Sequence, residues 1–281
     1  MAKISVIGIC GNSIFLNVDH FHEKGETVAA HSFFEEIGGK GINQAVACAK
    51  MGADVSFLGA VGDDIDADKC RKAAKEYGVN GFFAEKRGKK TTFAVILTDK
   101  NGENQVTGYR SAELQREDVL AFEQEIASSD ILLLQQEVPE EVNATAIELA
   151  KKHSVKVILN PAPIRPIPDY IAEYVFAVTP NTHEKQAIDV SRFANCITTL
   201  GDKGCDINGK TFIKALPVTP VDTTGAGDTF NGTLAVMLAQ GHDMETACKY
   251  AVCASGLSVT KNFVLCSIPT REEIERKMLN E

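Results

Sequence analysis

The chain has 281 residues, 44% of them hydrophobic, a formal net charge of −9 and eight cysteines. The acidic balance excludes a general nucleic-acid binder, which needs a basic surface, and no apolar run approaches the about 18 residues of a membrane-spanning helix. The cysteines are scattered and form no Cys-x-x-Cys pair, so we expect buried thiols in a single cytoplasmic domain, residues 1–281, rather than a disulfide framework.

The first part of the chain alternates short apolar runs with helix-forming stretches. Buried strands are predicted over residues 4–10 and 55–61, and helices over 42–51 and 66–77, which end at Gly52 and Gly78. Two segments do not fit this alternation. In each, a pair of strand-like runs flanks a glycine-containing turn, which predicts a β-hairpin: residues 15–19 with 28–34, and residues 92–98 with 104–109.

The rest of the chain continues the alternation. Strands are predicted over residues 131–134, 155–159, 175–178 and 196–200, with a helix over 140–152. Such alternation is typical of an α/β fold, with a doubly wound, mostly parallel sheet and helices on both faces. The hairpin segments, about 12–37 and 91–110, are expected to form a small β-sheet lid over one edge of that sheet, with free strand edges that could pair with a second subunit.

The strongest local signal is a glycine-rich segment before a helix predicted over residues 229–240: Asp222-Thr223-Thr224-Gly225-Ala226-Gly227-Asp228-Thr229-Phe230. Such a turn directs backbone N–H groups and the positive end of the helix dipole at one point, which suits a phosphoryl group. Asp228 falls in the first turn, where its carboxylate could take a proton from a hydroxyl. Taken alone, these residues are better explained by a tight turn in which Asp228 only complements the helix dipole.

Three further segments carry polar groups beside glycines or at the end of a strand. Gly38-Gly39-Lys40-Gly41-Ile42-Asn43 allows close approach of a ligand to the backbone and offers donors to hydroxyl groups. Asn181 and Glu184 follow a predicted strand and could organise Mg²⁺ through water, although helix capping is the better explanation for these two residues in isolation. The turn Thr199-Leu200-Gly201-Asp202-Lys203-Gly204 could pass under a nucleotide.

Together, these four segments resemble the ribokinase-like (PfkB) carbohydrate kinases. The Gly38–Asn43 segment with Gly59–Asp64 is similar to the first signature of the family, and Asp222–Phe230 is similar to its second. Asn181 and Glu184 resemble an Asn-x-x-Glu element, and Thr199–Gly204 resembles a nucleotide loop. The resemblance runs collinearly from about Ile4 to Pro269, and its motifs are closest to ribokinase in three segments: Gly39–Ala45, Gln136-Glu137 and Leu159–Pro163.

The resemblance implies ATP-dependent transfer of the γ-phosphoryl group to a primary hydroxyl of a small sugar, with Mg²⁺ as cofactor and Asp228 as the catalytic base. It implies that the transferring group is stabilised by Gly225, Ala226 and Gly227, and that the sugar is held by Gly39, Lys40, Asn43, Glu137 and Ser13. The nucleotide would contact Asn181, Thr199, Gly201 and Gly204. Glu184 would serve Mg²⁺ through water, and Asp222 with the Thr224 carbonyl would hold potassium. The lid would form a homodimer contact.

The sequence also departs from the pattern of the family. Gly11 and Ser13 stand where ribokinase-type enzymes have an Asn and an Asp that grip the sugar, which argues against ribose unless Asp19 takes over through a shifted alignment. Phe263 replaces a glycine in a turn that resembles part of the potassium loop. Val252 replaces a polar nucleotide contact. These changes bear on the identity of the sugar and the need for potassium.

Other classes of protein fit less well. A nicotinamide-dependent oxidoreductase would need Gly-x-Gly-x-x-Gly after the first strand, and a P-loop NTPase would need Gly-x4-Gly-Lys-Ser/Thr; neither motif is present. The remaining alternative is a catalytically weak or inactive sugar- or nucleoside-binding protein derived from a kinase. The changes at Gly11, Ser13 and Phe263 keep it open, while the intact turn before Asp228 favours an enzyme.

Overall fold

A central parallel sheet organises the protein, whose computed structural model describes residues 1–279. Six strands run in the order β10-β9-β8-β1-β4-β5, and every neighbouring pair is parallel. Their bounds are β1 Lys3–Ile7, β4 Asp54–Val61, β5 Asn80–Glu85, β8 Ile131–Gln135, β9 Lys156–Asn160 and β10 Val175–Val178. The edge strand β5 was not predicted, because its polar ends and Gly81 interrupt the apolar run.

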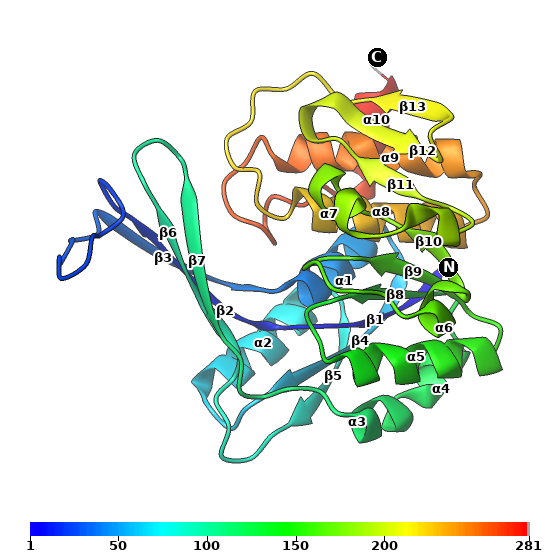
Figure 1. Ribbon diagram of the computed structural model, residues 1–281, viewed down its shortest axis with the longest axis horizontal. Coiled ribbons are helices and arrows are strands. Elements are labelled where there is room, and N and C mark those ends of the chain that lie inside the picture. The colour runs from blue at the N-terminus through cyan, green and yellow to red at the C-terminus, as the bar shows by residue number, and fades with distance from the viewer. Residues whose placement is uncertain (280–281) are drawn as a thin grey trace.

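Helices cover both faces of this sheet, as predicted (Figure 1). One face packs against α1 (Lys40–Lys50), α2 (Ile65–Glu76) and α8 (Ala226–Ala239), and α9 (Met244–Ser258) and α10 (Arg271–Leu279) extend the same core beyond α8. The other packs against α3 (Arg116–Ala121), α4 (Glu123–Ala127), α5 (Glu140–Lys152) and α6 (Asp169–Ala172). Alternate residues of β8 enter the two cores, with Leu133 in the first and Leu132 in the second, so the sheet is buried on both faces.

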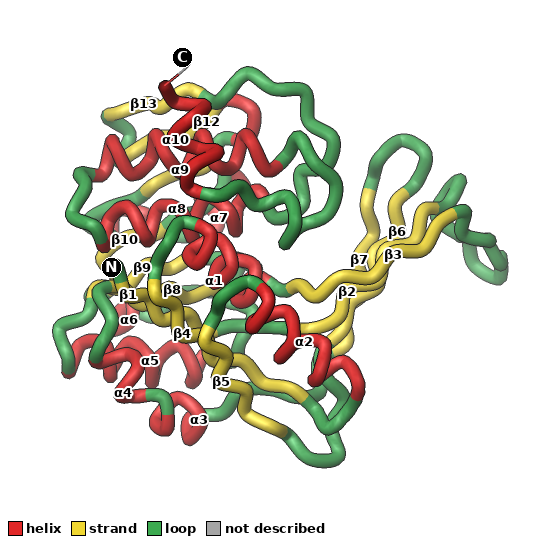
Figure 2. The backbone as a smooth tube through the Cα atoms, turned by 180° about the vertical axis from the view of Figure 1, so that it is seen from behind, coloured by secondary structure: helices red, strands yellow, loops and turns green. Residues whose placement is uncertain are grey.

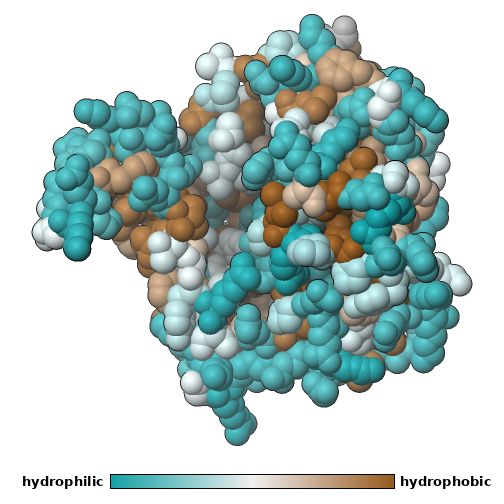
Figure 3. Space-filling view, in the orientation of Figure 1, coloured by the Kyte–Doolittle hydropathy of each residue, from teal (hydrophilic) through white to brown (hydrophobic). Residues whose placement is uncertain are grey.

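The two predicted hairpin segments form one separate sheet, which we call the lid. Its strands are β2 (Gly11–Asn17), β3 (Ser32–Gly38), β6 (Phe93–Thr98) and β7 (Asn104–Tyr109), in the order β3-β2-β6-β7. Two antiparallel pairs are joined by a parallel contact between β2 and β6. The lid projects from the body instead of lying flat on a sheet edge (Figures 1 and 2), and the surface is hollowed between the two (Figure 3). The return strand begins at Ser32, later than predicted.

The strand predicted over residues 196–200 is placed differently. Its core, β11 (Ile197–Thr199), belongs to a small antiparallel sheet with β12 (Gly204–Ile207) and β13 (Thr211–Lys214). Only isolated parallel bridges join this segment to the end of the main sheet, through Val178–Cys196 and Asn181–Thr199. The prediction that it continues the parallel series therefore holds only at these two bridges, because the regular ladder of β11 is antiparallel and lies with β12.

The segments between these strands are short. Helix α7 (Thr182–Ala187) and a 3₁₀ turn (Val190–Arg192) connect β10 to β11, and a second 3₁₀ turn (Gly201–Lys203) connects β11 to β12. Seven of the eight cysteines are buried, Cys266 is exposed, and all eight are outside disulfides, which agrees with the expected buried thiols. In the part of the chain that the structure describes, no helix combines the length and apolar character needed to cross a membrane.

Candidate active site

The glycine-rich segment forms the N-terminus of α8. Gly225 is the N-cap residue and has a φ of 74°, a left-handed conformation that suits glycine. The helix begins at Ala226, earlier than predicted, so Asp228 stands in its first turn as expected. Amide N–H groups in a first helical turn lack partners within the helix. The turn therefore directs donors and the positive end of the helix dipole at one side of Asp228.

Asp228 is 5% exposed, and its carboxylate is held by two side chains of α1. Asn43 Nδ2 donates to Oδ2 at 2.9 Å, and Gln44 Nε2 donates to Oδ1 at 3.0 Å. Gln44 is itself fixed, because its Oε1 accepts from Gln135 Nε2 at 2.7 Å and its Nε2 also lies 3.3 Å from Asn160 Oδ1. These bonds fix the orientation of the carboxylate.

Lys40, the first residue of α1, lies among three carboxylates. The charge of Asp228 raises the pKa of Lys40 above its ordinary value, and Glu137 and Glu184 add to this effect against the opposing effect of burial. The backbone N–H of Lys40 also donates to Glu137 Oε2 at 2.9 Å. Burial raises the pKa of Glu137, although the nearby Lys40 charge opposes the shift. The site thus has a fixed positive charge close to Asp228.

A cavity of about 250 Å³ opens over the N-terminus of α8. It brings together predicted site residues from four separate segments: Lys40, Asn181, Glu184, Thr199, Gly225, Ala226, Gly227 and Asp228. Asn181 and Glu184 form a reciprocal capping box at the start of α7, with Glu184 Oε2 accepting from Asn181 N at 2.9 Å. The capping alternative is therefore present in the structure. Both residues nevertheless line the cavity, and burial raises the pKa of Glu184.

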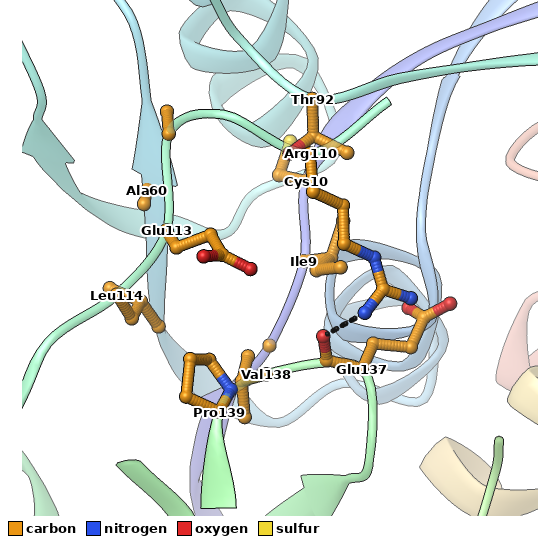
Figure 4. Close-up of a pocket in the computed structure, with 12 residues that line it drawn as sticks. Ile9, Cys10, Ala60, Thr92, Arg110, Glu113, Leu114, Glu137, Val138 and Pro139 are labelled. Carbon is orange, nitrogen blue, oxygen red and sulfur yellow. Dashed lines mark hydrogen bonds between the residues drawn. The ribbon is translucent and has the colours of Figure 1, made fainter. Parts of the chain in front are cut away.

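A small pocket of about 20 Å³ lies on the other side of Glu137, at the base of the lid (Figure 4). Arg110, which directly follows β7, donates from its guanidinium group to the Glu137 carbonyl oxygen at 3.0 Å. The Glu113 carboxylate lies across the pocket from this pair (Figure 4). Neither Arg110 nor Glu113 was predicted as a site residue, because no pattern in the sequence connects them to the glycine-rich segments.

Of the remaining predicted residues, Gly39 and Ser13 lie beside the start of α1, whereas Gly201 and Gly204 lie outside the cavity. Gly39 is the N-cap of α1 with a φ of 109°, and Ser13 Oγ is close enough to Gly38 that a Cβ there would lie 2.9 Å from it. Gly201 and Gly204 do not line the cavity with Thr199. Instead, Gly204 packs tightly against the backbone of β13.

The residues predicted for potassium, and the alternative at Asp19, are also located. Asp222 Oδ1 accepts from Thr224 N at 2.9 Å, and its Oδ2 accepts from Phe263 N at 3.2 Å. Asp19 is in the outer loop of the lid, where its exposed carboxylate pairs with His31 at 3.1 Å. It therefore does not replace a carboxylate at Ser13.

Several polar residues of the site were missed as individual contributors. Thr179 Oγ1 donates to Asn231 Oδ1 at 2.6 Å, and Asn231 Nδ2 donates to Gly227 O at 2.8 Å, so this chain of bonds supports the turn from below. Gln44 and Asn160 connect Asp228 to the sheet. Asn231 is three residues after Asp228 on a helix, and that spacing was the available signal.

Two buried acceptors of the site remain free. Among residues 1–279, Asn43 Oδ1 and Thr229 Oγ1 have no hydrogen-bond partner. A buried oxygen without a donor is costly, so the free Asn43 oxygen beside Asp228 fits a hydroxyl group that would donate to it. The amides of the α8 turn fit the phosphates of a nucleotide. The residues present therefore suit both a hydroxyl acceptor and a nucleotide.

Comparisons with known proteins agree with this geometry. Residues 1–271 match the family model described as pfkB family carbohydrate kinase. The chain is 35% identical to a ribokinase of Bacillus subtilis (strain 168), over 98% of this chain and 99% of that protein. The structure of a ribokinase from Thermotoga maritima has a TM-score of 0.89 at 35% identity and covers 100% of both chains. That of an Arabidopsis thaliana ribokinase complexed with ribose and ATP has a TM-score of 0.85 at 25% identity, over 98% of both.

Proposed function

The chain belongs to the pfkB family of carbohydrate kinases, and from this we propose that it moves the γ-phosphoryl group of ATP to a primary hydroxyl of a small sugar, with Asp228 as the base. The observation that carries the proposal is the position of the Asp228 carboxylate. It is held by Asn43 and Gln44 on one side of the first turn of α8, where the residues of that turn line the same cavity.

In the proposed reaction, Asp228 accepts the proton of the sugar hydroxyl. The sugar oxygen forms a bond to the γ-phosphorus, and the bond from that phosphorus to the β-γ bridging oxygen breaks, with its electron pair leaving on ADP. The amides of Gly225, Ala226 and Gly227 stabilise the charge on the phosphoryl oxygens during transfer. Lys40 adds a fixed positive charge beside Asp228.

The nucleotide side of the cavity is assigned to residues from two other segments. Asn181 and Thr199 line it, and the glycines after Thr199, Gly201 and Gly204, shape the turn that follows. When bound, Mg²⁺ supplies neutralisation of the phosphate charges. Glu184 lines the same cavity and would hold that ion through water, which its capping bonds to Asn181 permit because each carboxylate oxygen keeps a free lone pair.

The sugar is assigned to the opposite side, between α1 and the base of the lid. The Gly39 turn lets the sugar approach the backbone, and Asn43 Oδ1 accepts a hydrogen bond from a sugar hydroxyl. Glu137 and Lys40 offer hydrogen-bond partners for further hydroxyl groups. Ser13 provides a hydroxyl where the resemblance leads one to expect a carboxylate. The chain lacks that carboxylate, so we propose that its preferred acceptor is a small sugar or sugar-like compound other than ribose.

We also propose that potassium binds beside the turn of α8 and that the lid forms a dimer contact. Asp222 and the Thr224 carbonyl have the oxygen ligands that a monovalent cation takes, although both Asp222 oxygens already accept backbone N–H bonds.

A homodimer through the lid is supported by its free edge strands β3 and β7, which expose Phe33 (64%), Val106 (65%) and Tyr109 (50%). Light scattering over a wide range of concentrations would show a dimer; a monomer throughout would contradict this part.

The experiment that tests the function is a coupled ADP-release assay. The acceptors are pentoses, hexoses, deoxy sugars, sugar phosphates, sugar alcohols and nucleosides, with Mg²⁺ and with K⁺ or Na⁺ as the monovalent ion. We expect one class of acceptor to give clear turnover. Folded protein that binds ATP and phosphorylates none of them would favour the alternative of a sugar- or nucleoside-binding protein derived from a kinase.

A further inference from the structure

The strand β3 of the lid has two faces with different partners. Side chains of a strand alternate between its faces, so Phe34 and Glu36 share one side and Glu35 lies on the other. Glu35 Oε1 pairs with Lys69 of α2 at 2.7 Å. Phe34 instead stacks on Phe263, with ring centroids 3.5 Å apart and an interplanar angle of 17°. Phe263 lies in the loop between α9 and α10, residues 259–270.

Glu36 makes a second contact with the same loop. Its two carboxylate oxygens accept the backbone N–H groups of Val264 and Leu265, each at 2.8 Å. Hydrogen bonds to a charged acceptor are stronger than neutral ones. The lid is therefore joined to a loop more than 200 residues later in the chain. We call this set of contacts the lid latch; it consists of Phe34 and Glu36 from the lid and Phe263, Val264 and Leu265 from the loop.

The loop end of the lid latch also touches the phosphoryl turn. Val264 packs against Gly225 so closely that a Cβ at Gly225 would collide with its side chain. Phe263 N donates to Asp222 Oδ2, and Asp222 Oδ1 accepts from Thr224 N. Both contacts reach residues at or just before the N-cap of α8. A displacement of the loop would therefore move or loosen the turn that lines the cavity.

The backbone of Phe263 supports a specific role for its ring. Its φ is 69°, in the left-handed region that favours glycine and disfavours L side chains. Glycine would relieve this strain but would remove the ring that stacks on Phe34. The stack thus compensates for a strained backbone at the point where the loop meets the lid.

We propose that Phe34 and Glu36 of the lid are positioning residues for the phosphoryl turn of α8, acting through Phe263 and Val264. The proposal rests on the proposed function. Strand β3 leads directly into Gly39 and Lys40, the segment assigned to the acceptor. The lid latch therefore fixes the acceptor side of the site relative to the phosphoryl side from outside, as the Asn43–Asp228 bond does from inside.

The test compares Phe34→Ala and Glu36→Gln with Phe34→Tyr, which keeps an aromatic ring, and with Phe212→Ala. Phe212 is a matched control, because its ring is 56% exposed on β13, away from the lid. Two experiments are made: steady-state kinetics, which gives kcat and KM for the acceptor found in the ADP-release assay, and hydrogen exchange of the turn amides that are hydrogen-bonded, Thr224 N to Asp222 Oδ1 and Thr229 N to Gly225 O, with the core amide of Leu133 as reference.

We expect Phe34→Ala and Glu36→Gln to lower kcat about tenfold or more with KM changed less than about threefold, because misplaced groups weaken transition-state contacts. The turn amides should exchange faster while Leu133 does not, and Phe34→Tyr should behave as wild type. Turn exchange or kcat equal to that of Phe212→Ala would overturn the lid latch. If wild-type protein phosphorylates no acceptor, the proposed function fails, and the exchange comparison alone decides whether the lid latch positions the turn.

Discussion

Asn43 Nδ2 lies 2.9 Å from Asp228 Oδ2, although the two residues are 185 positions apart in the sequence. This contact joins the start of α1 to the start of α8 at the centre of the site. One amide group thereby orients the carboxylate, and its own Oδ1 remains without a partner within the described part of the chain. The same side chain can therefore fix the base and receive the hydroxyl on which the base acts.

Comparing Asn43→Leu with Gln44→Met should distinguish a residue that contacts both Asp228 and the sugar from one that contacts Asp228 but not the sugar. Asn43→Leu removes the donor to Asp228 and the free acceptor, so kcat/KM for the sugar should fall about 10- to 150-fold, as expected for a hydrogen bond to a charged group. Gln44→Met removes the other donor to Asp228 together with the bonds to Gln135 and Asn160, but it removes no free acceptor, because every polar atom of Gln44 is already bonded within the protein. It should lower kcat and leave the sugar KM unchanged. Steady-state kinetics with varied sugar measures both; a raised sugar KM in Gln44→Met would contradict this division.

Two glycines of the α8 turn should respond in opposite ways to alanine. Gly225 has a φ of 74° and its added Cβ would collide with Val264, so Gly225→Ala should lower the free energy of unfolding by about 1–2 kcal/mol. Gly227 is inside the helix, and the space that a Cβ would enter there is open, so Gly227→Ala should raise it by about 0.5–1 kcal/mol. Urea denaturation measures both changes. Equal destabilisation by the two variants would show that the left-handed N-cap does not control the turn.

The pKa of Glu137 predicts a pH dependence of stability. Burial raises it above an ordinary value of 4.5, so the folded protein holds a proton that the unfolded chain has released. The contribution of Glu137 to the free energy of unfolding is fully present below about pH 4, and it is lost as pH rises through the pKa of the folded state. Glu137→Gln cannot titrate. The Tm of wild type should therefore fall relative to that of Glu137→Gln from about pH 4.5 upward, and a constant difference in Tm from about pH 4 to 7 would contradict the raised pKa.

The local parts of the site could be predicted from the sequence. The turn before Asp228, the capping pair Asn181 and Glu184, and both lid hairpins depend on residues close together in the chain. Their glycines and polar side chains therefore reveal them without knowledge of the fold. The doubly wound sheet was predictable for the same reason, because its strands and helices alternate in order.

The parts that failed depend on contacts between distant segments. The sequence does not show that β11 forms its regular ladder with β12 and only isolated bridges with the end of β10, because the short run before Gly201 could pair on either side. It does not show that Arg110 lies against Glu137, or that Glu36 binds the amide of Val264. Phe263 was recognised only as a departure from a glycine, and its ring partner, Phe34, became apparent only in the structure.

The most direct test of the central claim compares Asp228→Asn with wild type, using the acceptor from the ADP-release assay. The variant keeps the shape of the side chain but removes the base, so kcat should fall by a factor of about 10² to 10⁴. Its affinity for ADP, measured by calorimetry, should stay within about threefold, because the α8 amides are retained. A variant with near-wild-type kcat would contradict the assignment of Asp228 as the base and, with it, the account of the site.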